Sequence, residues 1–428
     1  MRSSRLADET RLADDRLSEA RDAGALDADR IARAAAAGAG VIRETPVLSS
    51  RTLAERTGVT VALKAENLQR TGSFKLRGAL AKIASLSDAE CRRGVVAGSA
   101  GNHGQAVAYA ARARGIHCEV VMPEAAPIAK AEAAISLGAE VRLTGDTVDD
   151  SLAAARERAI AAGLAFVHPF DDLDVIAGQG GLGLELLAQV PEMTRLVVPV
   201  GGGGLISGVA VAIKAHRPEV EVIGVQVDTC APFPASLAAG QPVAVDSALT
   251  IADGIAVKRP AELTLALIDR WVDRLVVVGE DDVAEAMVFL LERAKLVVEG
   301  AGAVGVAAML SGQVQGAEQG TTAIVLSGGN VDPGLLAQIA RRHESQAKRR
   351  LVLLARLPDR PGSLALLLAL VGQQGANLLD VEHIREGFDL HVRESAVQLV
   401  LETRGPGHAA QVTRAVREAG YAEPLAVR

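Results

Sequence analysis

A lysine and an arginine lie where the sequence predicts the start of a helix. In RTGSFKLRGA, residues 70–79, Ser73 is placed to cap a helix whose apolar face begins at Leu76. Lys75 and Arg77 then fall in the first turn, where the helix dipole disfavours cations. The helix end and the neighbouring guanidinium should both lower the pKa of Lys75. Such a lysine can form a Schiff base with an aldehyde, although a surface lysine would have the same pattern.

A run of four glycines follows a predicted strand in VVPVGGGGLISG. Gly201, Gly202, Gly203 and Gly204 precede a helix, whose N-terminal amides can bind a phosphate. A flexible turn is the alternative, but four glycines in succession cost considerable backbone entropy. A reactive lysine together with a phosphate-binding loop is what pyridoxal phosphate requires.

Three further stretches contain candidate polar side chains, and two of them, SAGNHG and LSGGN, follow predicted strands. SAGNHG, residues 99–104, offers amides and the Ser99 and Asn102 side chains to a carboxylate or a ring oxygen, and its His103 could equally be a cap-bonded histidine. VEGAGA contains a single carboxylate, Glu299, suited to a helix cap or to function. In LSGGN, the hydroxyl of Ser327 and two glycines end a predicted strand.

Composition describes a globular protein of two or three domains. The chain has 428 residues, of which 49% are hydrophobic and 23% charged, with a net charge of −7. This charge argues against nucleic acid as a main partner. Cys91, Cys118 and Cys230 lie far apart, which favours a reducing cytoplasm. We expect no secretory leader, because MRSSRLADETRLADD has no apolar stretch. We expect no membrane span, because the longest uncharged run, Leu196–Ile213, contains a proline and the glycine run.

Short apolar runs alternate with Ala-rich amphipathic stretches from about 30 to 335. This alternation predicts an α/β fold, with parallel sheets buried on both faces and ligands at the ends of their strands. The predicted strands are Val61–Glu66, Gly94–Gly98, His117–Met122, Glu140–Leu143, Leu196–Val200, Glu221–Val227 and Thr322–Leu326.

The pattern of apolar and charged residues changes near residue 340. RRHESQAKRR is a charged connector, and a β-α-β-β-α-β pattern follows it, which indicates a ferredoxin-like unit. The predicted elements of this unit are Leu351–Arg356, Ser363–Gly372, Asn377–Arg385, Glu394–Leu401, His408–Ala419 and Glu423–Val427. We therefore divide the chain into a charged extension (1–29), a catalytic domain (30–342, with a smaller subdomain at roughly 65–165), a linker (343–350) and a C-terminal domain (351–428).

Six motifs, in this order, resemble the threonine/serine dehydratases among the pyridoxal-phosphate enzymes of the tryptophan-synthase-β type. They are TGSFKLRGA, SAGNHGQAVA, VPVGGGGLISG, TIADGIAV, VVEGAGA and IVLSGGN. The resemblance implies two doubly wound, mostly parallel α/β subdomains with the cofactor in the cleft between them. LPDRPGSL and GANLLDVEHIR resemble an ACT domain, a module that often binds regulatory amino acids.

The resemblance also implies a role for each matching residue. Lys75 would bind pyridoxal phosphate covalently beside Phe74, and Asn102 and Ser327 would contact the ring hydroxyl and the ring nitrogen. The phosphate would lie on Gly201–Gly204 and Leu205, and the substrate carboxylate on Ser99, Ala100, Gly101 and His103. Gly254 would line the ring, with Glu299 near the cofactor or the substrate hydroxyl. In the ACT-like part, Asp359, Arg360, Gly362 and Asn377 are the candidate effector residues.

The resemblance further implies a threonine ammonia-lyase that makes 2-oxobutanoate and ammonia, and pyruvate from serine. A serine or threonine racemase and a degenerate amino-acid sensor are the alternatives. Some relatives bind a cation after the VIGVQ strand, but here prolines follow Asp228, so we expect no metal. We expect a homo-oligomer, a dimer or tetramer; the effector, and the choice between isoleucine synthesis and threonine breakdown, stay open.

Overall fold

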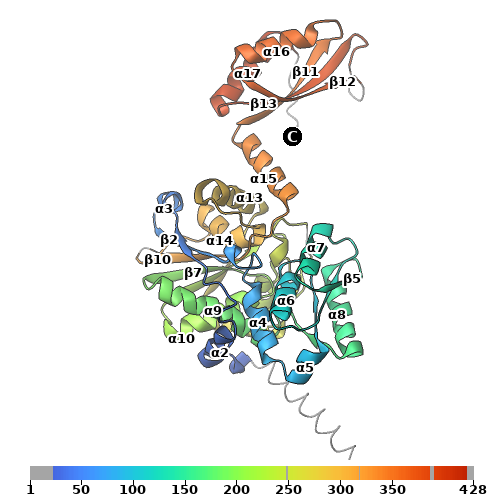
Figure 1. Cartoon of the computed structure of the whole chain (residues 1–428). Helices are drawn as coiled ribbons and strands as arrows, with labels where there is room; N and C mark the ends of the chain where they lie inside the picture. Colours follow the sequence, from blue (N-terminus) through green and yellow to red (C-terminus); the bar gives the residue numbers. More distant parts are fainter. Residues whose placement is uncertain (1–22, 247–248, 318, 386–389, 422–428) are drawn as a thin grey trace, which may run out of the picture. The chain divides into compact units, whose positions relative to one another are not determined.

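The computed structural model describes residues 23–246, 249–317, 319–385 and 390–421 (Figure 1). They cluster into two compact units, which divide between Val331 and Asp332. Most of the predicted extension 1–29 and the predicted last strand Glu423–Val427 lie outside the described residues. Among the described residues, no helix is long and apolar enough to cross a bilayer.

The larger sheet of the first unit has six strands, in the order β1-β2-β10-β7-β8-β9. Every neighbouring pair is parallel except β1 and β2. The central strands are almost wholly buried, as expected for uninterrupted Val/Ile/Leu runs covered on both faces. The strands are β1 (Val47–Ser49), β2 (Thr60–Ala65), β7 (Met193–Pro199), β8 (Glu221–Val227), β9 (Arg274–Val278) and β10 (Thr321–Leu326).

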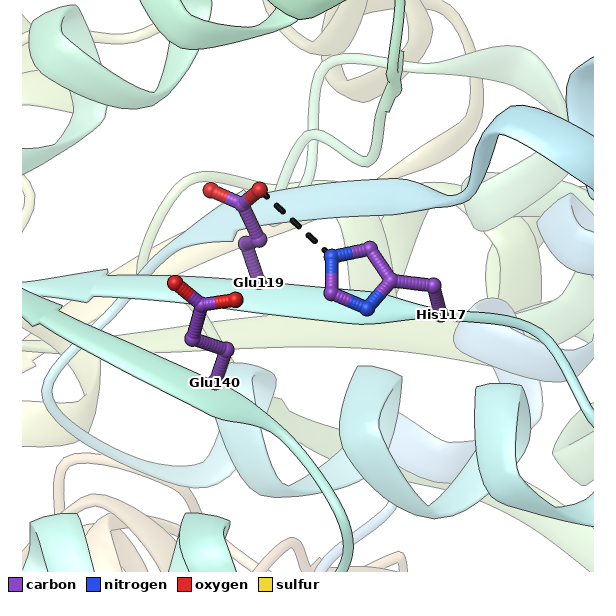
Figure 2. A group of neighbouring side chains, drawn as sticks. All are labelled: His117, Glu119 and Glu140. Atoms are coloured by element: carbon purple, nitrogen blue, oxygen red, sulfur yellow. Dashed lines mark hydrogen bonds and ion pairs between the residues drawn. The ribbon is translucent and has the colours of Figure 1, made fainter.

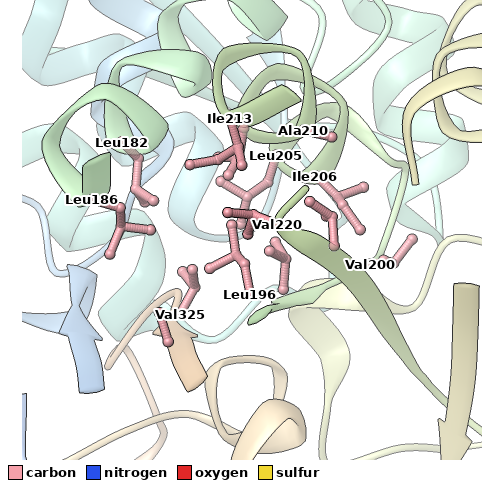
Figure 3. Packing of buried hydrophobic residues seen from close by; sticks show 14 of the residues in the cluster. Leu182, Leu186, Leu196, Val200, Leu205, Ile206, Ala210, Ile213, Val220 and Val325 are labelled. Atoms are coloured by element: carbon pink, nitrogen blue, oxygen red, sulfur yellow. The ribbon is translucent and has the colours of Figure 1, made fainter. Parts of the chain in front are cut away.

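Helices α9 (Leu173–Gln189) and α10 (Gly204–His216) pack against each other beside this sheet. Figure 3 shows their leucines and isoleucines meeting the valines and leucines of β7 and β10. The uncharged run of the sequence thus divides into strand β7, the glycine turn and helix α10. The other helices and helical turns of this region are η1 (Ala23–Ala25), α2 (Ala28–Ala37), α3 (Arg51–Thr57), η2 (Glu66–Leu68), α11 (Pro232–Ala239), η3 (Asp253–Ile255), α12 (Glu262–Trp271), α13 (Glu280–Phe289), the π-helix η4 (Leu290–Ala294) and α14 (Gly300–Leu310).

A smaller parallel sheet, in the order β5-β4-β3-β6, forms the second α/β layer of this unit (Figure 1). Its core is built largely from alanine and valine, in keeping with a chain that has few aromatics. The elements are α4 (Lys75–Ser85), α5 (Asp88–Arg93), β3 (Val95–Gly98), α6 (Asn102–Ala113), β4 (Cys118–Met122), α7 (Ile128–Ser136), β5 (Glu140–Leu143), α8 (Val148–Ala162) and β6 (Ala165–Phe166). The predicted fold class, two mostly parallel α/β sheets, is confirmed.

The second unit contains a three-stranded antiparallel sheet in the order β11-β13-β12. Its elements are α15 (Pro333–Gln346), β11 (Arg350–Pro358), α16 (Ser363–Gln373), β12 (Asn377–Ile384), β13 (Glu394–Glu402) and α17 (Pro406–Glu418). Of residues 343–350, predicted as a linker, 343–346 end α15, 347–349 connect the two elements and Arg350 begins β11. Helix α15 buries only Ile339, and its second half, RRHESQ, has no apolar face that would mark it as a helix in the sequence.

The predicted cap of helix α4 is wrong. The helix begins at Lys75, and Phe74 occupies the cap position without a side-chain hydrogen bond. Ser73 instead pairs with Gly328 in an isolated bridge, and its hydroxyl has no partner in the described structure. The amide of Phe74 donates to the Ser327 carbonyl, so pairing with the loop after β10, not a local cap, fixes where α4 begins.

Arg77 does not face Lys75 but belongs to a buried ion-pair network. Its guanidinium donates to both oxygens of Glu66 and to both oxygens of Glu185, which also accepts from Lys64. The side chains of Arg77 and Glu66 are 4% and 0% exposed. Burial opposes ionisation of Glu66, but the guanidinium outweighs it and lowers the pKa of that carboxyl. The arginine of the opening motif therefore joins α4 to α9 and to the turn η2 that follows β2.

Replacing Arg77 should destabilise the fold strongly. In Arg77→Ala, the Glu66 and Glu185 carboxylates lose their guanidinium partner inside the protein, and we expect a loss of about 3–5 kcal/mol in the free energy of unfolding. Denaturant titration of the purified variant measures it. Arg51→Ala, which removes an exposed ion pair to Glu55, is the matched control and should unfold as the wild type does. Equal stability of the two variants would contradict this interpretation.

Candidate active site

The first unit contains a cavity of about 930 Å³ at the carboxyl ends of strands from both sheets. The loops after β3, β7 and β10 all reach it, as parallel sheets lead one to expect. Every site residue predicted in this unit lines it: Phe74, Lys75, Ser99, Ala100, Gly101, Asn102, His103, Gly201, Gly202, Gly203, Gly204, Leu205, Gly254, Glu299 and Ser327.

The Lys75 amine lies in this cavity and donates to the carbonyl of Pro169 at 2.9 Å. Burial lowers the pKa of Lys75 to about 8, with the Glu299 carboxylate acting in the opposite direction. The direction agrees with the sequence prediction, but the cause is burial and not a neighbouring guanidinium. At pH 7 about a tenth of the amine is neutral, compared with less than about a thousandth for an exposed lysine.

The glycine loop between β7 and α10 has no room for side chains. A Cβ atom on Gly202 would lie 2.3 Å from the Phe170 ring, and one on Gly203, whose φ is +90°, would lie 2.9 Å from the Phe233 ring. The loop ends at the first turn of α10, where free backbone amides and the helix dipole favour an anion. These features fit a phosphate group.

Glu299 is a buried acid at the N-terminal end of α14. Its Oε1 accepts from Nδ2 of Asn102 at 2.8 Å. Burial, reinforced by the nearby Asp253 carboxylate, raises the pKa of Glu299 to about 7. Glu299 therefore changes its protonation state near neutral pH, which suits a group that gives or takes a proton.

Two neutral histidines lie beside Lys75. Nε2 of His103 lies 2.8 Å from the Val167 carbonyl, so this nitrogen holds the proton, and burial lowers the pKa of His103 to about 3. His168, which the sequence did not point to, accepts from the amide of Asp171 at 2.7 Å, and burial lowers its pKa well below the usual value. This hydrogen bond from Asp171 to His168 closes the turn that contains Pro169, whose carbonyl accepts from Lys75. No short motif distinguishes this histidine, which is found only through its contacts.

The structure separates the candidate effector residues of the second unit. Three of them lie between β11 and α16, where Asp359 accepts from Arg385 at 2.7 Å. Asn377 lies at the other end of the sheet, because it pairs with Glu402, which pairs in turn with the first residue of β11. This places it roughly 27 Å, the length of strand β11, from the others. Within one chain, Asn377 therefore cannot share a site with Asp359, Arg360 and Gly362.

Among the described residues, one group of histidine and acidic side chains is close enough to hold a metal ion: His117, Glu119 and Glu140 (Figure 2). Arg142 and Arg158 donate to the Glu119 carboxylate, and the Arg158 bond is the main cause that lowers the pKa of Glu119 to about 2. Two guanidinium groups occupy the oxygens that a cation would need, so we assign no metal to this group. Asp228 is not a member of it.

The residues present fit pyridoxal phosphate. The buried Lys75 amine can react with an aldehyde, the side-chain-free loop suits a phosphate, and the Ser327 hydroxyl lies at the same cavity. The fold and this cavity define an enzyme that binds a phosphorylated aldehyde on a lysine.

Comparisons with known proteins agree with this class. Residues 39–328 match the family model described as pyridoxal-phosphate dependent enzyme. The L-threonine ammonia-lyase of Thermotoga maritima is 47% identical over 382 residues, which are 89% of this chain and 94% of the relative. The structure of maize serine racemase has a TM-score of 0.70 at 36% identity and covers 75% of this chain and 98% of its own. The structure of threonine deaminase isoform 2 from Solanum lycopersicum has a TM-score of 0.68 at 34% identity and covers 73% of this chain and 93% of its own.

The chain thus belongs to the pyridoxal-phosphate dependent enzymes and, within them, to the threonine ammonia-lyase family. The 382 residues shared with the Thermotoga relative exceed the 331 of the first unit, so that relative also resembles part of the second unit.

A methyl group on the glycine loop should weaken cofactor binding. In Gly202→Ala the new Cβ meets the Phe170 ring, so the loop must move away from the place where we expect the phosphate. We expect the affinity of the apoenzyme for pyridoxal phosphate to fall more than about tenfold, measured by absorbance titration. Gly372→Ala, at a helical glycine with nothing within 4 Å of the added atom, should bind as the wild type does. Unchanged affinity of Gly202→Ala would exclude this loop as the phosphate site.

Covalent loading of the apoenzyme should depend on the protonation of Lys75. The neutral amine is the reactive form, so the rate should rise about tenfold per pH unit from pH 6 and level off near the pKa of about 8. Stopped-flow absorbance after mixing with pyridoxal phosphate gives this profile. A rate that continues to rise to pH 10 would show that the amine has the pKa of an exposed lysine.

Proposed function

We propose that this enzyme converts L-threonine into 2-oxobutanoate and ammonia, and L-serine into pyruvate and ammonia. The main support is the pairing, in one cavity, of a buried amine with a pKa of about 8 and a buried acid with a pKa of about 7. Removing an α-proton and a β-hydroxyl from one substrate requires a base and an acid at the same site. The bound pyridoxal phosphate supplies the electron withdrawal that makes the α-proton acidic.

Lys75 is the proposed base. Once its nitrogen is free, the low-pKa amine accepts the α-proton, and its hydrogen bond to the Pro169 carbonyl directs the side chain. The neutral imidazoles of His103 and His168 surround it without adding a positive charge. The loop from Ser99 to His103 at the end of β3 is proposed to hold the substrate carboxylate with backbone amides.

Glu299 is the proposed acid for the leaving hydroxyl. Near neutral pH a good part of this buried carboxyl is protonated, and its bond from Asn102 fixes one oxygen. Ser327 is proposed to face the ring nitrogen with a hydroxyl. A hydroxyl cannot hold that nitrogen protonated as a carboxylate would, so elimination should closely follow removal of the α-proton.

A racemase is the second candidate, because maize serine racemase shares the fold at a TM-score of 0.70. The ammonia-lyase of Thermotoga maritima has higher identity, 47%, over more of the chain. The similarity to that relative also extends into the second unit, and this favours the lyase.

The second unit is proposed to be an ACT-like regulatory domain. Its β-α-β-β-α order supports this. So does the loop before helix α16, where Gly362, with a φ of +87°, is the N-cap residue. We further propose a homo-oligomer, a dimer or tetramer, since Leu378, Leu379 and Val381 are exposed on the edge strand β12. The thiols of Cys91 and Cys118, which form no disulfide, support a cytoplasmic location.

One assay separates the two activities. Incubated with L-threonine or L-serine, the enzyme should release 2-oxo acid, with D-amino acid at no more than about a hundredth of that amount. Both products are measured in the same samples by chiral chromatography and by coupled reduction of the 2-oxo acid. D-serine as the main product would replace the lyase with the racemase. Repeating the assay with isoleucine or valine tests regulation by the second unit.

A further inference from the structure

A chain of three amide and carboxyl side chains runs along one wall of the cavity. Nδ2 of Asn330 donates to the carbonyl of Thr71 at 2.9 Å and to Oδ1 of Asn102 at 2.7 Å. Nδ2 of Asn102 then donates to Oε1 of Glu299 at 2.8 Å. Asn330 is exposed at the cavity wall, so hydrogen bonds rather than packing must hold its side chain.

The direction of this chain is fixed by its first member. A backbone carbonyl can only accept a hydrogen bond, so Asn330 must present its NH₂ group to Thr71. The carbonyl itself cannot turn freely, because the same peptide unit donates through the Gly72 amide to the carbonyl of Gln69 at 2.8 Å. The second N–H of Asn330 then meets Asn102, which must present its oxygen there and its NH₂ group to Glu299.

Two glycines leave the space that this arrangement needs. A Cβ atom on Gly72, whose φ is +74°, would lie 2.4 Å from Oδ1 of Asn330. One on Gly328 would lie 2.2 Å from Oε1 of Glu299 and 3.3 Å from Nδ2 of Asn102. The backbone of the loops before α4 and after β10 thus approaches these side chains as closely as it can.

We propose that Asn330 is a positioning residue that orients the Asn102 amide, so that an N–H of Asn102, and not its oxygen, faces the cofactor. This inference rests on the proposed placement of the pyridoxal ring oxygen beside Asn102. Glu299 uses one hydrogen of the Asn102 NH₂ group, and the other is available to the ring. An ionised ring oxygen is stabilised by an N–H and repelled by an amide oxygen.

The substitution Asn330→Asp should reverse the direction of the hydrogen bonds between these side chains. Asn330→Asp can only accept, so Asn102 turns to donate to it and presents Oδ1 to Glu299 and the ring. We expect the affinity of the apoenzyme for pyridoxal phosphate to fall about tenfold, and the pH midpoint of the bound cofactor's visible absorbance to shift. Asn330→Ala removes the hydrogen bonds of the Asn330 side chain without adding a charge, and it should lower the affinity for pyridoxal phosphate about threefold.

A double-mutant cycle tests whether the effect passes through Asn102. In the Asn102→Ala background, Asn330→Asp and Asn330→Ala should each change the affinity less than about twofold and leave the absorbance midpoint in place. Equal losses in both backgrounds would overturn the positioning role. If Asn102→Ala alone binds and absorbs as the wild type does, the placement of the ring is wrong and the proposal falls with it.

Folding of each variant is checked by thermal unfolding of the apoenzyme. If Asn330→Asp does not fold, Asn330→Ala is compared in the wild-type and the Asn102→Ala backgrounds. A side chain with a merely structural role would lower the affinity for pyridoxal phosphate equally in both backgrounds.

Discussion

The site depends on keeping one lysine amine away from water. Lys75 begins helix α4 inside the cavity, and its amine donates to a backbone carbonyl, which does not neutralise a charge. The cost of burying an ammonium group lowers the pKa of Lys75 to about 8 and makes the neutral, reactive amine accessible. Burial also accounts for the neutral His103 and the raised pKa of Glu299.

The rest of the first unit holds that amine in place. The Arg77 network ties α4 to β2 and α9, and the pairing of Phe74 with the Ser327 carbonyl fixes the first turn of the helix. The glycine loop belongs to the larger sheet and the SAGNHG loop to the smaller one. Both reach the lysine because parallel strands of the two sheets end at one cavity. Fold and chemistry are therefore set by the same contacts.

The sequence predicted the fold class because buried parallel strands are continuous apolar runs that need no tertiary information to recognise. It missed β1, β6 and β9, of which β1 and β6 are three and two residues long and lie with β9 at sheet edges. It also misplaced the cap of α4, since Ser73 pairs with Gly328, which is far away in the sequence. Local patterns cannot show such a contact.

The same distinction applies to the site. The glycine run and Ser327 lie in short motifs next to strand ends, and Lys75 lies at the start of a predicted helix, so spacing and residue type reveal them. No local pattern points to His168, and although Asn330 ends the LSGGN motif, only the structure shows the hydrogen-bond partners of these two side chains. The π-helix before Glu299 likewise has no recognisable pattern in the sequence.

The covalent attachment at Lys75 can be examined directly. The purified enzyme, saturated with pyridoxal phosphate, is reduced with borohydride, digested and analysed by peptide mass spectrometry. A phosphopyridoxyl group on the peptide that contains Lys75 is the predicted result. An unmodified Lys75, with the cofactor on another residue or on none, would contradict the account of this cavity as the catalytic site.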